Sequence, residues 1–216
     1  ISSGLVGSEM CIRDSPYRAY IEHEPYSVDK SIYIEDGTSI NDAISEIINQ
    51  NFINKIFLRY FLISHNIKTL KSGEYEIYKK TMSQIIFDMY EGNTITHKLL
   101  INEGINIYDL NKLINESNLI NDCQYLSCIK TDFNFKEGIL FPDTYFYKKN
   151  NFASDILQKS HDRLKNYLDD LNFSSNNNDL DIEELLILAS IVEKEAGNND
   201  EKKLIAGVFL RRLEER

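Results

Sequence analysis

The 216-residue chain contains 42% hydrophobic and 27% charged residues, proportions typical of a globular protein long enough to bury a substantial core. Its formal net charge of −10 and pI near 4.9 argue against a surface that binds nucleic acid or an anionic membrane. No apolar run approaches the roughly 18 residues of a transmembrane helix. No Cys-x-x-Cys or His-Glu-x-x-His spacing indicates a metal site.

The first half of the chain is predicted to open with a strand–helix–helix–strand unit. Residues 1–15 lack the basic and apolar regions of a signal peptide and are interpreted as a foreign segment, and residues 16–30 as an irregular linker. The unit itself is expected to comprise a strand over Ser31–Glu35, a turn at Asp36-Gly37, a helix capped by Thr38 or Ser39, a second helix over Asn54–Asn66 and a strand over Glu74–Tyr78.

The middle of the chain is predicted to mix short helices with one strand. Thr81 is expected to cap a helix that Gly92 ends. After it come a strand over Thr94–Ile101, a helix over Tyr108–Asn115 and a short helix over Leu119–Ile129. Cys123 and Cys128 are interpreted as buried thiols, with a disulfide in an oxidising compartment as the alternative.

The segment Glu137–Tyr147 is rich in β-branched and aromatic residues, which favours extended backbone, and Pro142 excludes a central strand position. Its aromatic side chains either pack in the core of an edge strand or line a cleft, where sugar rings stack on aromatic faces. A helix over Phe152–Leu171 and an asparagine-rich loop at Ser174–Asp179 are predicted to follow.

The stretch Asp181–Gly197 is predicted to be a helix buried on most sides, because its apolar residues cover every face. Asp181 and Glu184 form a capping-box pattern, and Gly197 is a typical stop. Glu193 and Glu195 follow the apolar run and point about 200° apart on a helix. Burial and the helix dipole are both expected to raise the pKa of the inward carboxyl, as a general acid requires. A solvated helix end is the alternative.

A last helix over Asp200–Arg216 is predicted, with Asn199 as its cap. Its apolar residues are expected to face inward: Leu204, Ile205, Val208, Phe209 and Leu213.

Three segments of the second half form a set with consistent order and spacing. They read Glu137-Gly-Ile-Leu-Phe-Pro-Asp-Thr-Tyr145, Ala189-Ser-Ile-Val-Glu-Lys-Glu195 and Val208-Phe-Leu-Arg-Arg-Leu213. Together they resemble the signature segments of the endolytic murein transglycosylases, the YceG-like family. By its pattern alone, the strand–helix–helix–strand unit is similar to the LysM-like, glycan-binding region of that family.

The resemblance implies an α+β fold with a LysM-like βααβ region and a mainly helical catalytic portion that ends early. It places the LysM-like and connecting region at 31–129 and the front of the catalytic domain at 130–216. It implies cleavage of peptidoglycan between N-acetylmuramic acid and N-acetylglucosamine within the glycan strand, leaving 1,6-anhydromuramic ends, with no cofactor and no metal.

The resemblance also implies a setting and partners. Members are held in the bacterial plasma membrane by one N-terminal helix, here expected to precede this chain, and face the periplasm or cell exterior. They act on peptidoglycan strands beside cell-wall synthases, the penicillin-binding proteins. Nucleic acid is not expected as a partner.

The catalytic glutamate of the family falls on Glu195. Its substrate-contacting segments fall on Glu137, Phe141, Asp143, Tyr145 and Glu193. A lytic reaction needs one carboxyl for both proton transfers, because the C6 hydroxyl of the sugar attacks its own anomeric carbon. Two glutamates on opposite faces of one helix do not form the carboxylate pair of a hydrolase. Glu193 is instead expected to tie the helix end to a neighbour such as Arg212.

Two departures from the family pattern stand out. Arg211 replaces the usual asparagine, and a downstream Gln-Ser-Asp-Pro-Thr-like motif is absent, so weak activity is expected of this chain alone. The rival interpretations are a non-catalytic glycan-binding module and a synthase-recruiting scaffold. A serine or cysteine hydrolase is disfavoured, since no Gly-x-Ser-x-Gly elbow exists.

Overall fold

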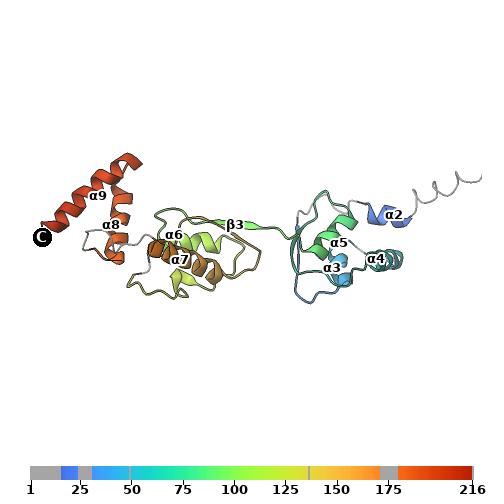
Figure 1. The fold of residues 1–216 in the computed structure, drawn as a ribbon. Helices are drawn as coiled ribbons and strands as arrows, with labels where there is room; N and C mark the ends of the chain where they lie inside the picture. The colour runs from blue at the N-terminus through green and yellow to red at the C-terminus, as the bar shows by residue number, and fades with distance from the viewer. Residues whose placement is uncertain (1–15, 24–30, 49, 136, 171–179, 216) are drawn as a thin grey trace, which may run out of the picture. The chain divides into compact units, whose positions relative to one another are not determined.

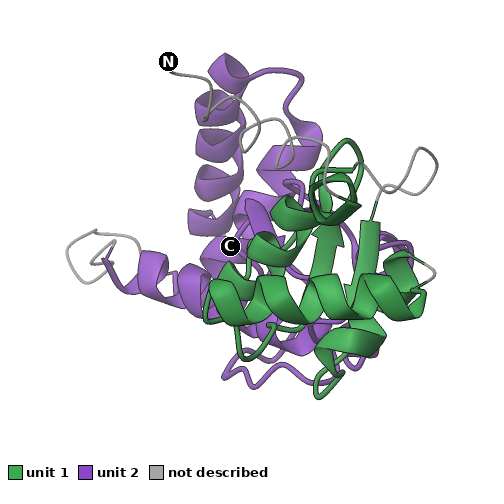
Figure 2. Cartoon of the chain, turned by 90° about the vertical axis from the view of Figure 1, so that its right-hand side faces the viewer, with its two compact units in different colours: residues 1–96 green, residues 97–216 purple. Residues whose placement is uncertain are grey.

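The computed structural model describes residues 16–23, 31–48, 50–135, 137–170 and 180–215 (Figure 1). The chain divides into two compact units, residues 1–96 and 97–216 (Figure 2). Helices and a two-stranded antiparallel sheet occur in each unit, which confirms the predicted mixture of α and β structure. The division falls inside the predicted 31–129 region, whereas the functional boundary at 129/130 stays a prediction. The segment 1–15 lies outside the described residues.

The first unit is built around the predicted strand–helix–helix–strand order. The strands β1 (Ser31–Ile34) and β2 (Gly73–Glu76) pair antiparallel, with Ser31 opposite Glu76 and Ile34 opposite Gly73. Between them in the chain lie α3 (Ile40–Ile47) and α4 (Phe52–Ser64), and α5 (Met82–Glu91) follows β2.

Local capping signals position these helices as predicted. The Ser39 side chain accepts a hydrogen bond from the backbone N–H of Asp42 at the start of α3. Thr81 and Gln84 form a reciprocal capping box at the start of α5, and Gly92 ends that helix in the left-handed conformation, with φ of 83°.

A linker was predicted where the structure has a helix, α2 (Pro16–Ile21). The prediction is wrong there because Tyr20 and Ile21 are buried in the core of the first unit. The other buried residues of this core come mainly from α3, α4, β2 and α5: Ala43, Ile44, Ile47, Leu58, Phe61, Tyr75, Met82, Ile85, Ile86 and Met89.

The second unit contains β3 (His97–Leu100), α6 (Ile107–Asn115), the 3₁₀ turn η1 (Gln124–Leu126), β4 (Thr144–Tyr147), α7 (Ala153–Asp170), α8 (Ile182–Glu195) and α9 (Asn199–Glu214). The strands β3 and β4 pair antiparallel, with His97 opposite Tyr147 and Leu100 opposite Thr144. Within the described residues β3 is the only strand neighbour of β4, so Pro142 precedes an edge strand, as predicted.

The short helix expected over 119–129 is largely absent. Only η1 is helical there, because Tyr125 and Leu126 adopt positive φ values of 50° and 57°, which an α-helix excludes. Cys123 and Cys128 form a disulfide across this loop, so the preferred interpretation as free thiols is wrong. The loop predicted at Ser174–Asp179 lies outside the described residues.

Candidate functional site

The carboxyl end of α8 separates the two glutamates of the Glu-Lys-Glu pattern. Asp181 and Glu184 form the predicted capping box, which fixes where the helix begins. At its other end, the Glu193 carboxylate pairs with Lys202 Nζ of α9 at 2.7 Å. Arg212, suggested from the sequence, is therefore not this partner. Glu195 lies about 200° around the helix from Glu193 and is exposed to solvent.

The expectation that α8 is buried on most sides is wrong. Val192 is its only buried residue among those described, and Ile187 and Ile191 are exposed. The main packing partner of α8 within the described elements is α9, and one helix covers only one face of another (Figure 1). The apolar residues of α9 are likewise not buried, so its inward stripe was also wrong. The described residues do not supply the apolar surroundings predicted for Glu195.

The cap of α9 is Asn198, one residue before the predicted Asn199, and the Asn198 side chain accepts from the backbone N–H groups of Asp200 and Glu201.

A second group of predicted site residues lies where β4 meets α7. The Tyr145 hydroxyl donates a hydrogen bond of 2.8 Å to the carbonyl oxygen of Phe141, and the Tyr145 ring is buried in the core of the second unit. The Phe141 ring is half-buried, with the Arg163 guanidinium 4.6 Å from its centroid and the Tyr167 ring 5.6 Å away. The sequence left open whether these aromatic side chains pack in the core or line a cleft, and the Tyr145 side chain packs in the core.

Asp143 is held by two donors in this group. The backbone N–H of Thr144 donates to Asp143 Oδ1 at 2.6 Å, and Arg163 forms an ion pair with Oδ2. The Thr144 N–H, followed by the Arg163 guanidinium, holds the pKa of the Asp143 carboxyl below its usual range. Asp143 is therefore an anion that positions Arg163 over Phe141.

Three residues of α7 complete this group, and the sequence did not identify them. Ser160 donates from its hydroxyl to the Phe141 carbonyl at 3.1 Å, and Arg163 and Tyr167 flank the Phe141 ring. Ser160, Arg163 and Tyr167 are spaced three and four residues apart, which places them in one row on a helix. That spacing was the available signal, but only the tertiary structure connects the row to Phe141 and Asp143.

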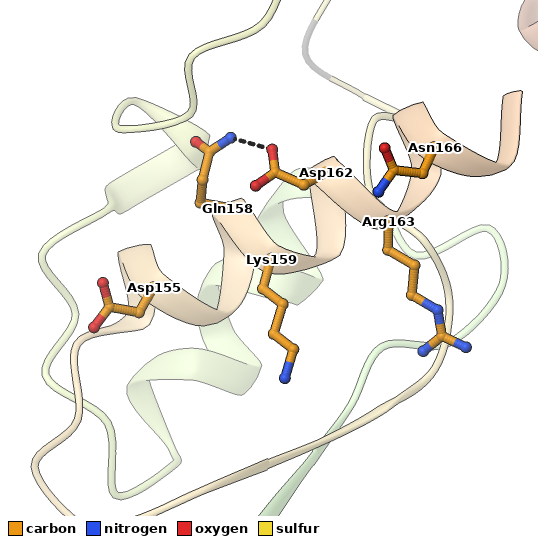
Figure 3. A pocket seen from close by; sticks show the side chains of 6 residues that line it. All are labelled: Asp155, Gln158, Lys159, Asp162, Arg163 and Asn166. Atoms are coloured by element: carbon orange, nitrogen blue, oxygen red, sulfur yellow. Dashed lines mark hydrogen bonds between the residues drawn. The ribbon is translucent and has the colours of Figure 1, made fainter. Parts of the chain in front are cut away.

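A shallow hollow of about 500 Å³ lies on the exposed face of α7 (Figure 3). All of its lining residues carry a polar or charged group. Gln158 Nε2 donates to Asp162 Oδ1 at 2.8 Å, and Lys159 and Arg163 extend to the same side of the helix. Arg163 belongs both to this hollow and to the Asp143 pair. The full lining comprises Asp155, Gln158, Lys159, Asp162, Arg163 and Asn166.

Glu137 lies apart from both groups of site residues, at the start of α6. Its carboxylate accepts a hydrogen bond of 3.2 Å from the backbone N–H of Ile107, the first residue of that helix. Phe141, Asp143 and Tyr145 thus lie together, while Glu193 and Glu195 lie at the end of α8. Within the ranges that the structure describes, no hydrogen bond or ion pair joins these sets, and no three His, Cys, Asp or Glu side chains form a metal-binding group.

No helix among the described residues has the length and apolar character needed to cross a membrane.

Curated proteins from two bacteria with sequences similar to this chain carry the same name. A protein of Streptococcus pneumoniae named endolytic murein transglycosylase is 36% identical over 77 residues, which cover 36% of this chain and 14% of that protein. A Bacillus subtilis protein of the same name is 23% identical over 214 residues, covering 86% of this chain and 59% of that protein. The chain therefore spans less than two thirds of these curated relatives.

A solved structure and a family description complete the comparison. The crystal structure of a YceG-like protein from Listeria monocytogenes matches with 24% identity and a TM-score of 0.43, covering 86% of this chain and 70% of that one. The sequence model of the YceG-like family matches residues 32–216, which is most of the chain, and the chain therefore belongs to the YceG-like family.

Proposed function

We propose that this chain is part of an endolytic peptidoglycan lytic transglycosylase, a lyase. It cuts the bond between N-acetylmuramic acid and N-acetylglucosamine within glycan strands and leaves 1,6-anhydromuramic ends. The observation that carries this proposal is membership of the YceG-like family over residues 32–216, whose curated relatives are named endolytic murein transglycosylases.

Glu195 is the single acid and base of the proposed reaction. Its carboxyl first donates a proton to the glycosidic oxygen as the bond to the anomeric carbon breaks. The resulting carboxylate then accepts the proton of the C6 hydroxyl as that oxygen attacks the anomeric carbon, which regenerates the acid. The ion pair of Glu193 with Lys202 supports this assignment, because it leaves Glu195 as the uncommitted glutamate at the end of α8.

The glycan strand is proposed to contact Phe141 and Asp143, where a half-buried ring lies beside a charged pair. Tyr145 holds the backbone of Phe141 through the hydrogen bond from its hydroxyl to the Phe141 carbonyl, and Glu137 holds the start of α6. Glu193 contributes by fixing the end of α8 against α9. No metal or cofactor takes part.

The wider setting is also part of the proposal. Residues 31–129 contain the LysM-like and connecting region, and residues 130–216 the front portion of the catalytic domain. The β1-α3-α4-β2 order supports the LysM-like assignment. The protein acts on the outer side of the plasma membrane, held by an N-terminal anchor, beside penicillin-binding proteins.

The test is release of anhydromuropeptides from purified peptidoglycan, identified by mass spectrometry. Little release is expected from this chain alone, so the assay also uses the protein from its complete reading frame. Glu195→Gln is expected to lower release by at least about 100-fold, since a general acid–base contributes 10²–10⁴-fold. Glu214→Gln, at an exposed glutamate of α9 outside the proposed site, is the matched control and is expected to retain most activity.

Two outcomes contradict the proposal. Equal release by Glu195→Gln removes that residue from the chemistry, and reducing muramic ends in the products indicate hydrolysis instead of a lytic reaction. If wild type and Glu195→Gln are both retained on insoluble peptidoglycan and neither releases any product, the rival glycan-binding module is favoured.

A further inference from the structure

The helix α4 is apolar on two opposite faces. Leu58 and Phe61 are buried in the core of the first unit, and Phe57 is partly buried against it. Successive helix residues turn by about 100°, so the exposed apolar residues gather within an arc of about 100° on the other side. These residues, each between 51% and 78% exposed, are Phe52, Ile53, Ile56, Tyr60 and Ile63, and together they are called the outer α4 face.

The neighbouring helix α3 shows what an ordinary surface helix of this unit presents. It buries Ala43, Ile44 and Ile47, and its exposed positions are polar: Asn41, Asp42, Ser45 and Glu46. By contrast, a contiguous apolar face that remains exposed is typical of a surface that binds another partner. The α2 helix packs beside α4 (Figure 1), with Tyr17 against Phe57 and against Tyr60 of the outer α4 face. Every residue of that face nevertheless stays more than half exposed.

The charge around this face is positive in an otherwise acidic chain. Lys55 and Arg59 are exposed and lie at one edge of the outer α4 face. Between Glu46 and Glu74 the sequence contains no Asp or Glu, although the whole chain has a net charge of −10. Within the described part of the chain neither cation forms an ion pair, so both are available to an anionic partner.

We propose that the outer α4 face binds an anionic phospholipid surface as a peripheral contact, with the helix lying flat in the headgroup region. A helix of 13 residues is about 20 Å long, which suits lying in the interface and is too short to span a bilayer. Its apolar side chains enter the acyl boundary while Lys55 and Arg59 contact lipid phosphates. This surface belongs to the first unit and Glu195 to the second, and the proposal does not depend on the lytic reaction.

Charge decides between a lipid surface and a second copy of the chain. A symmetric dimer through this face brings two sets of Lys55 and Arg59 to one interface. The segment between Glu46 and Glu74 supplies no carboxylate to neutralise them, and juxtaposed like charges oppose association. The phosphates of a phospholipid surface, in contrast, form ion pairs with Lys55 and Arg59.

The test is co-sedimentation of the whole chain with vesicles of phosphatidylglycerol and phosphatidylcholine, compared with phosphatidylcholine alone. Binding is expected only with phosphatidylglycerol and is expected to weaken as salt is added. Ile53→Ser/Ile63→Ser and Lys55→Gln/Arg59→Gln are each expected to weaken binding at least about tenfold, and all four side chains are exposed, so folding is preserved.

Matched controls change equally exposed residues elsewhere. Leu100→Ser/Leu204→Ser and Lys98→Gln/Lys112→Gln are expected to bind as the wild type does. Absence of wild-type binding overturns the proposal, as does equal weakening by the controls. A wild-type dimer that both α4 variants convert to monomers in the absence of vesicles shows that a second copy covers the face, and also overturns it.

Discussion

At the scale of single residues, Arg163 links the aromatic segment to α7. It pairs with Asp143 and lies over the Phe141 ring, so one side chain serves both an ionic and a cation–π contact. The sequence marked Phe141 and Asp143 but not Arg163, because 20 residues separate Asp143 from Arg163 and no local rule connects them. Arg163 is a positioning residue for the proposed glycan contact.

The Asp143 carboxyl provides a direct measurement of this link. Its pKa is lowered first by the Thr144 N–H and second by Arg163, so Arg163→Gln is expected to raise the pKa while leaving it below the ordinary value of 3.8. Carbon-detected NMR titration of the Asp143 carboxyl measures the change. Lys159→Gln, one turn earlier on α7, is the matched control and is expected to leave this pKa as it is.

The sign of the stability effect follows from the lowered pKa. A depressed carboxyl pKa contributes stability that is fully present above the unfolded value near 3.8 and is lost as pH falls through the folded value. Wild type and Arg163→Gln should therefore differ more in urea midpoint at pH 7 than at pH 2. A difference that grows on acidification contradicts this account.

At the scale of elements, the sequence predicted local features better than burial. The caps at Ser39, Thr81 and Asp181 depend on residues within one turn, and all three are present. The burial of α8 depends instead on what packs against it, which a run of apolar residues cannot specify. The helix predicted over Leu119–Ile129 is largely absent for a related reason. A disulfide and two left-handed residues override helix propensity there.

The disulfide between Cys123 and Cys128 is expected to stabilise the second unit. Closing so short a loop contributes about 2 kcal/mol on the chain-entropy estimate.

Urea unfolding with and without a reductant measures this contribution. Reduction is expected to lower the unfolding free energy of the second unit by about 2 kcal/mol. The Cys123→Ala/Cys128→Ala variant is the control and should not respond to reductant. An unchanged wild-type midpoint after verified reduction shows that the crosslink does not contribute.

At the scale of the whole molecule, the described residues form two separate hydrophobic cores. One contains residues from Tyr20 to Met89, and the other residues from Leu99 to Leu157, with no member in common. The net charge of −10 likewise averages over regions that differ, since the segment around α4 is basic. Properties of the whole chain therefore do not describe either unit.

Separate cores imply separate stabilities, which two matched substitutions can measure. Ile86 and Leu157 are fully buried, one in each core, and truncation of such a side chain to alanine costs about 2–5 kcal/mol. Ile86→Ala is expected to lower hydrogen-exchange protection in residues 31–96 and to leave 97–170 unchanged, while Leu157→Ala does the reverse. Exchange of each segment, followed by mass spectrometry in low urea, distinguishes the two. If either variant lowers protection equally in both segments, the cores unfold as one cooperative unit, because only shared cooperativity transmits a cavity in one core to the other.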